Sequence, residues 1–208
     1  SSENVAIGHQ ALTAQNGGVG NIGIGYNAGL SNTTADYNVI LGDAAGDALT
    51  TGGRNIVVGK GGLGTATTAL LNVAIGTSAM ELVPADRAIS SCIAIGKDAF
   101  QGAAATTTGV DGTVAIGYKA LQDLTTGTNN TAIGHQAMLE HTTGGYNIAI
   151  GHNAMQDTDA GSTSLASQRN IFIGSHCGGG TWTDTDNSYN TAIGVFAMDS
   201  ALAGSVQN

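Results

Sequence analysis

The chain has 208 residues, with 6 Lys+Arg against 15 Asp+Glu, 33 glycines and only 4% aromatic residues. So few basic residues argue against binding to nucleic-acid phosphates, and so few aromatic residues do not suit an ordinary globular core. No apolar run approaches the roughly 18 residues of a membrane span. A hydrophobic content of 41% is too high for simple disorder. These features favour a repetitive, extended, β-rich protein.

An internal repeat runs through the whole chain. The pattern Asn-x-x-aliphatic-Gly occurs eleven times, with Cys92 and Thr113 replacing the asparagine in two copies. The first five copies follow one another every 17 residues, and they end at Gly8, Gly25, Gly42, Gly59 and Gly76. The later copies are 17 to 23 residues apart, and they end at Gly96, Gly117, Gly134, Gly151, Gly174 and Gly194. The extra residues always lie between a glycine and the next asparagine, which is typical of a solenoid with loop insertions.

Each column of the repeat indicates a local structure. Two aliphatic or β-branched residues flank a small one before the glycine, as in residues 5–7 and 148–150, which predicts a short strand. The glycine predicts a tight corner that needs positive φ or a close backbone approach. Three residues later, a small residue followed by a larger apolar one, such as Ala79-Met80, suggests a second short strand on the opposite wall. The asparagine column is expected to form an internal ladder of amides between coils.

The predicted fold is an all-β parallel β-solenoid, or β-roll, of about eleven coils in a single repeat domain, 1–208. Regular coils are expected over 4–80 and 113–156, and loop-inserted coils over 81–112 and 157–208. Coils about 4.8 Å apart would give a rod of roughly 50 Å. So slender a roll would leave its small-residue face in water, so we expect the alanine and glycine columns to be covered by sister chains in a homotrimer.

The motif Asn-[Thr/Val]-Ala-Ile-Gly-x-x-Ala-[Leu/Met], followed by Thr-Thr-Gly, resembles the repeats of phage tail fibres and related bacterial surface proteins. It is also similar to the heads of YadA-like trimeric autotransporter adhesins, which are left-handed parallel β-rolls. The resemblance covers all eleven copies. It implies a non-enzymatic, extracellular, trimeric fibre without a cofactor: a phage tail fibre that positions or contributes to a receptor-binding surface, or alternatively a bacterial surface adhesin or filament. The ends of the chain, close to the repeat boundaries, suggest a piece of a longer fibre.

Histidines recur in one column. His9, His135 and His152 each directly follow the corner glycine, in a column that elsewhere accepts Tyr, Asp, Lys, Thr, Ser and Val. A column that accepts every chemistry is expected to face solvent. If it faces a trimer axis instead, His135 and His152 would form stacked rings able to bind a metal ion. No Ser-His-Asp arrangement emerges from the repeat, so we expect no catalytic residues.

The insertions are the expected place for recognition, because loops on a rigid scaffold carry binding residues. The last one, 178–189, contains Trp182 near Asp184, Asp186 and Tyr189. A tryptophan flanked by acidic groups could contact a cell-surface glycan. The alternative is that the indole fills a gap in the rod or packs against a neighbouring chain.

Two further features have ordinary structural interpretations. Cys92 and Cys177 lie four coils apart, too far to form a disulfide within one chain, and are expected to be packed free thiols. The threonines Thr34, Thr51 and Thr68 are in register. They are interpreted as turn residues, with an ice-binding rank as the less favoured alternative.

Overall fold

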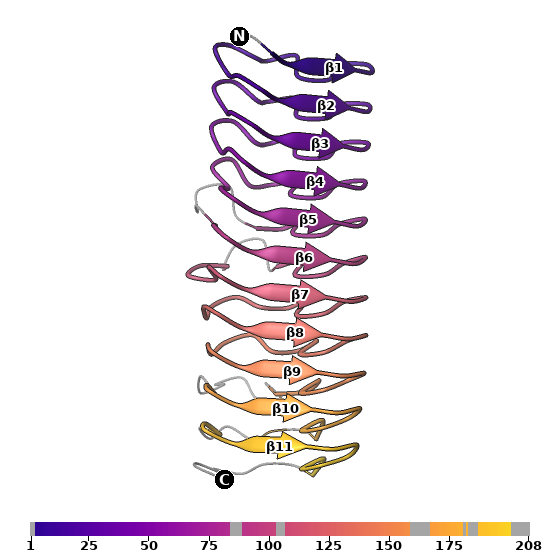
Figure 1. Ribbon diagram of the computed structural model, residues 1–208, viewed down its shortest axis with the longest axis vertical. Helices are drawn as coiled ribbons and strands as arrows, with labels where there is room; N and C mark the ends of the chain where they lie inside the picture. Colours follow the sequence, from indigo (N-terminus) through magenta and orange to yellow (C-terminus); the bar gives the residue numbers. More distant parts are fainter. Residues whose placement is uncertain are drawn as a thin grey trace.

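A computed structural model describes residues 3–83, 89–102, 107–158, 167–180, 182 and 187–200. Within them the chain forms eleven three-residue strands in one parallel sheet, ordered as in the sequence. Figure 1 shows the coils stacked in an elongated rod, with the strands aligned along one side. The predicted all-β parallel solenoid is therefore confirmed. The strands are β1 Val5–Ile7, β2 Ile22–Ile24, β3 Val39–Leu41, β4 Ile56–Val58, β5 Val73–Ile75, β6 Ile93–Ile95, β7 Val114–Ile116, β8 Thr131–Ile133, β9 Ile148–Ile150, β10 Ile171–Ile173 and β11 Thr191–Ile193.

The insertions leave the register of the sheet unchanged. Val73 of β5 pairs with Ile93 of β6 across a 20-residue repeat, in the same register as Ile22 and Val39 across a 17-residue repeat. The same holds between Ile148 of β9 and Ile171 of β10. Extra residues are thus accommodated between a corner and the next strand, where they do not disturb the stacking.

The two faces of the strands are arranged opposite to our expectation. The small central residues, such as Ala74, Ala94 and Ala115, point into the tube and are fully buried. The aliphatic residues on either side of them are partly exposed in most strands. The prediction that the alanine column faces outward and needs sister chains to cover it is therefore wrong. The coil interior is so narrow that mostly small side chains fit at the strand centre, while branched chains stand on the outer face.

The predicted asparagine ladder is present. In the middle of it, Asn55 donates from its backbone N–H to Oδ1 of Asn38 at 2.9 Å, and from Nδ2 to the carbonyl of Ala69 at 2.8 Å. Its own Oδ1 accepts from the backbone N–H of Asn72 at 3.0 Å. The three asparagines are buried, so each amide satisfies polar groups of neighbouring coils that water cannot reach. Cys92 continues the ladder with its backbone N–H, which lies 2.9 Å from Asn72 Oδ1.

The corner glycines have the geometry predicted for them. Gly117 adopts φ +137°, and a Cβ atom placed on it would lie 2.2 Å from the carbonyl oxygen of Gly134 in the next coil. The other corners that face a following coil meet the next glycine in the same way. Only glycine fits because both the dihedral angle and the close backbone approach exclude a side chain.

The second strand predicted on the opposite wall is not formed in the part of the chain that the structure describes. The segment after each corner is a series of turns, in which residues such as Gln136 and Met138 have φ of 53°. Alternating left-handed residues prevent the extended conformation of a strand. The backbone still bonds between coils there, for example from Met138 N–H to Ala154 O at 2.9 Å.

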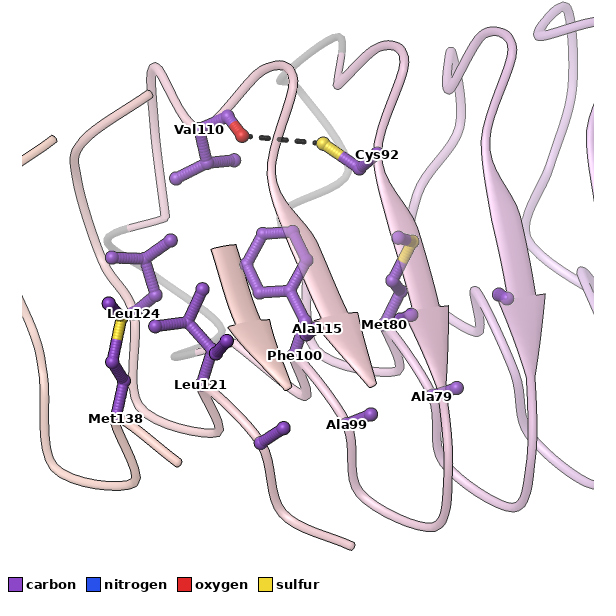
Figure 2. Packing of buried hydrophobic residues seen from close by; sticks show 14 of the residues in the cluster. Ala79, Met80, Cys92, Ala99, Phe100, Val110, Ala115, Leu121, Leu124 and Met138 are labelled. Atoms are coloured by element: carbon purple, nitrogen blue, oxygen red, sulfur yellow. Dashed lines mark hydrogen bonds between the residues drawn. The ribbon is translucent and has the colours of Figure 1, made fainter. Parts of the chain in front are cut away.

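The interior is filled by residues that compensate for one another in size. Next to the strand-centre alanines lie the large side chains Met80, Phe100, Leu121 and Met138, all of them buried (Figure 2). In the coil of β10 the strand centre is the large Phe172, and the same position in the turn is a glycine: a Cβ atom on Gly178 would lie 2.6 Å from the Phe172 ring. The glycine therefore makes room for the ring in that coil.

Candidate functional site

A strip of aliphatic side chains runs along the outer face of the sheet. We call the first and third residues of the eleven strands the aliphatic strip: 20 of these 22 residues are Val, Ile or Leu, and the others are Thr131 and Thr191. None is charged, although the whole chain carries a net charge of −9. Most of these side chains are partly exposed. Exposure reaches 42% at Ile56 within the stack and 70% at Ile193, which lies in the last strand of the sheet.

The strip is long and narrow. Eleven strands about 4.8 Å apart give a length of about 48 Å, and two side-chain columns occupy a width of about 10 Å, or about 500 Å². This is at the upper end of the apolar patches that soluble monomers expose, and contiguous patches of this size often mark interaction sites. The aliphatic strip is therefore the main candidate functional surface.

A file of stacked rings follows the corner glycines of the C-terminal coils. Neighbouring rings in this file have centroids 5.0 to 5.2 Å apart, in the order Tyr118, His135, His152, His176 and Phe196. The His135–His152 and His176–Phe196 pairs are stacked, and the two other pairs are tilted. His135 and His152 are exposed, as their column predicted. Their rings are nearly parallel, at 12° and 5.1 Å. Since the rings cover each other's faces, their edges and ring nitrogens are what they offer to a ligand.

A second group of stacked side chains lies at the residue before the asparagine, at the other end of the strands. The Arg169 guanidinium lies 5.3 Å from the Tyr146 ring and 5.5 Å from the Tyr189 ring. It also donates to the Tyr189 hydroxyl at 3.2 Å. The sequence indicates Tyr189 as a candidate glycan contact, and the structure adds its pairing with Arg169. The register of the repeat contained that signal, because all three residues directly precede the ladder position.

The Trp182 prediction requires a correction. The indole is 1% exposed, donates from Nε1 to the Gly178 carbonyl at 3.2 Å, and packs against Phe172 at 5.6 Å between ring centroids. It lies in the core of the tube, so its ring has no free face for a sugar. The gap-filling alternative describes this position. Asp184 and Asp186 fall outside the described residues.

The cysteines and the threonine rank are the remaining candidates from the sequence. Cys92 and Cys177 are buried free thiols, as predicted, and Cys92 Sγ lies 3.3 Å from the Val110 carbonyl (Figure 2). Thr34, Thr51 and Thr68 form an exposed rank. No set of three or more His, Cys, Asp or Glu side chains is arranged around a metal position in the described ranges. Over the same residues, no helix is long and apolar enough to cross a bilayer.

Comparisons with protein-family models, with curated proteins and with solved structures give no match to this chain. Its class is therefore defined by the fold itself, a parallel β-solenoid repeat protein.

Proposed function

We propose that this chain is a structural and adhesive segment of an extracellular trimeric fibre, of the kind found in phage tail fibres, that positions or contributes to a host receptor-binding surface. The observation that carries the proposal is the aliphatic strip, which runs along the whole stack of strands. A stack of coils joined by backbone and asparagine hydrogen bonds suits a stiff shaft. Repetition along such a shaft also suits the addition of many weak contacts by avidity.

The partner in this proposal is the chain itself. The strip carries no charge, while each chain has a net charge of −9. When the strips of neighbouring chains cover one another, the negatively charged side chains, which repel each other, therefore lie outside the interface and face solvent. Three copies arranged around one axis would each turn the strip toward the two others, and a closed three-fold arrangement leaves no strip uncovered. This replaces the predicted alanine-lined interface by an interface of Val and Ile.

The role is proposed to be non-enzymatic and independent of a cofactor, with no nucleic-acid or membrane-inserted partner. The ladder asparagines, which are the most regular polar groups of the interior, bond to backbone and to one another, which suits a mechanical role. The alternative is a bacterial cell-surface adhesin or filament built on the same rod. An ice-binding role is supported only by the exposed rank of Thr34, Thr51 and Thr68.

Sedimentation equilibrium tests the assembly. We expect the wild-type protein to sediment at three times its 20.6 kDa chain mass. Ile116→Asp, which places a charge in the strip, should shift the protein toward the monomer because an unpaired carboxylate would be buried. Asn129→Asp is the matched control: it adds the same charge at an exposed residue with φ 59°, which aspartate tolerates.

A wild-type monomer would overturn the trimer, and equal dissociation of both variants would overturn the placement of its interface on the aliphatic strip. The location is tested separately by gold-labelled antibodies against this chain, applied to intact virions and cells of its source. Label on a tail appendage supports the tail fibre, and label on the cell surface supports the adhesin. Label confined to the cytoplasm would contradict both. Thermal hysteresis in the purified protein would support the ice-binding role instead.

A further inference from the structure

Two exposed histidines in the file of rings are placed so that their ring nitrogens could bind a ligand together. His135 and His152 occupy the same repeat position in adjacent coils, directly after Gly134 and Gly151. Backbone bonds fix that position: Gly134 N–H donates to Ile116 O and Gly151 N–H to Ile133 O, each at 2.8 Å. The rings are parallel to within 12°, with centroids 5.1 Å apart. The scaffold thus holds two exposed imidazoles side by side.

The hydrogen bonding of the file distinguishes this pair from the third histidine. His176 has both nitrogens engaged, with Nδ1 3.0 Å from Ser175 Oγ and Nε2 3.5 Å from Asn153 Nδ2. No hydrogen bond within the described residues engages the ring nitrogens of His135 or His152. Both rings therefore keep a lone pair that is open to solvent.

We propose that His135 and His152 together chelate a divalent late transition-metal ion, with Cu²⁺ bound most tightly. Imidazole suits Cu, Ni and Zn, and affinity within this series is highest for Cu²⁺. Metal–nitrogen bonds of about 2.0–2.1 Å would need the two nitrogens within about 4.2 Å of each other. The rings of His135 and His152 are nearly parallel, so their in-plane lone pairs point the same way. To chelate one ion, each exposed imidazole must turn about its side-chain bonds until a nitrogen faces the ion, while the backbone stays in register.

The site is a two-ligand chelate at the surface. No third His, Cys, Asp or Glu side chain among the described residues converges with this pair, so water or an outside ligand completes the coordination. The bound ion is therefore exchangeable. Hard cations such as Ca²⁺ and Mg²⁺, which prefer oxygen ligands, are not expected to bind here.

Isothermal titration calorimetry with Cu²⁺ alone tests the proposal on the full chain. His135→Gln and His152→Gln should each bind at the site at least about tenfold more weakly, because each loses one of the two ligands. Two control variants leave both proposed ligands, His135 and His152, in place. His9→Gln removes an exposed imidazole of the same column, whose ring stacks on Tyr26 at 5.3 Å rather than on another histidine. His176→Gln removes the histidine whose nitrogens are already engaged.

We expect both controls to bind Cu²⁺ as the wild type does, and electron paramagnetic resonance of the wild-type complex to report two nitrogen ligands. Acidification should release the ion, because a protonated imidazole has no free lone pair. Matching circular dichroism melts would show that every variant is folded. Binding that survives in both His135→Gln and His152→Gln, or that is lost equally in His9→Gln, would overturn the proposal, as would a spectrum with a single nitrogen ligand.

Discussion

Replacing Asn55 by alanine should strongly destabilise the solenoid. The Asn55 amide donates to Asn38 Oδ1 at 3.0 Å and to the Ala69 carbonyl at 2.8 Å, and it accepts from the N–H of Asn72 at 3.0 Å. In Asn55→Ala the Ala69 carbonyl and the Asn72 N–H lose these partners inside the tube. A buried polar group left unpaired costs about 1–3 kcal/mol, so the two together cost about 2–6 kcal/mol. That is a large part of the about 5–15 kcal/mol that stabilises a typical native protein.

Equilibrium urea unfolding followed by circular dichroism measures this loss. The matched control is Asn16→Ala, which removes the amide of an exposed asparagine outside the ladder and should change the free energy of unfolding by about 0.5 kcal/mol or less. Because each coil contacts only its neighbours, hydrogen exchange should accelerate first in the coils on either side of residue 55. Equal unfolding free energies for Asn55→Ala and Asn16→Ala would refute the structural role of the ladder.

Three further predictions concern the corner, a thiol and a carboxyl group. Gly117→Ala should lower the melting temperature markedly, because φ is +137° and the new Cβ would lie 2.2 Å from Gly134 O; an unchanged melt would contradict the corner geometry. Burial raises the pKa of the Cys92 thiol to about 11, so a thiol reagent at neutral pH should modify it only after unfolding, and rapid labelling of the folded protein would be inconsistent with this. Desolvation, followed by the nearby Asp157 carboxylate, raises the pKa of Glu140 above 4.5. The folded state therefore holds that proton more tightly than the unfolded state. The free energy of unfolding falls as pH rises through the range between the unfolded-state and folded-state pKa values of Glu140. Glu140→Gln should melt slightly higher than wild type at pH 7 and no higher below about pH 4, where the carboxyl is protonated in both states; a lower melting temperature at pH 7 would reverse the sign.

The architecture could be predicted because the repeat constrains it many times over. A glycine that recurs at every corner, and an asparagine at the start of nearly every strand, allow few structures other than stacked coils. The same periodicity placed His135 and His152 in one exposed column, and the structure stacks their rings at 5.1 Å. Repetition makes residues at equivalent positions neighbours in space, so their contacts follow from the alignment of the copies.

The sequence did not predict which face of the strand lies inside. Alternation of aliphatic and small residues is compatible with either orientation, and we assigned the larger apolar side chains to the interior. The decisive quantity is the width of the tube, which turn residues such as Met80 and Phe100 already fill. For Trp182 the sequence left a glycan contact and a gap-filling role both open, because its insertion obscures the repeat position. The structure buries the indole and packs it against Phe172.

A near-atomic structure of the assembled protein in solution, obtained by electron cryomicroscopy, tests the central claim most directly. The account predicts three parallel rods whose Val and Ile side chains from β1 to β11 meet between chains, while the strand-centre alanines stay inside each coil. A map of single rods with those Val and Ile side chains in solvent, or of chains joined through a different face, would contradict it.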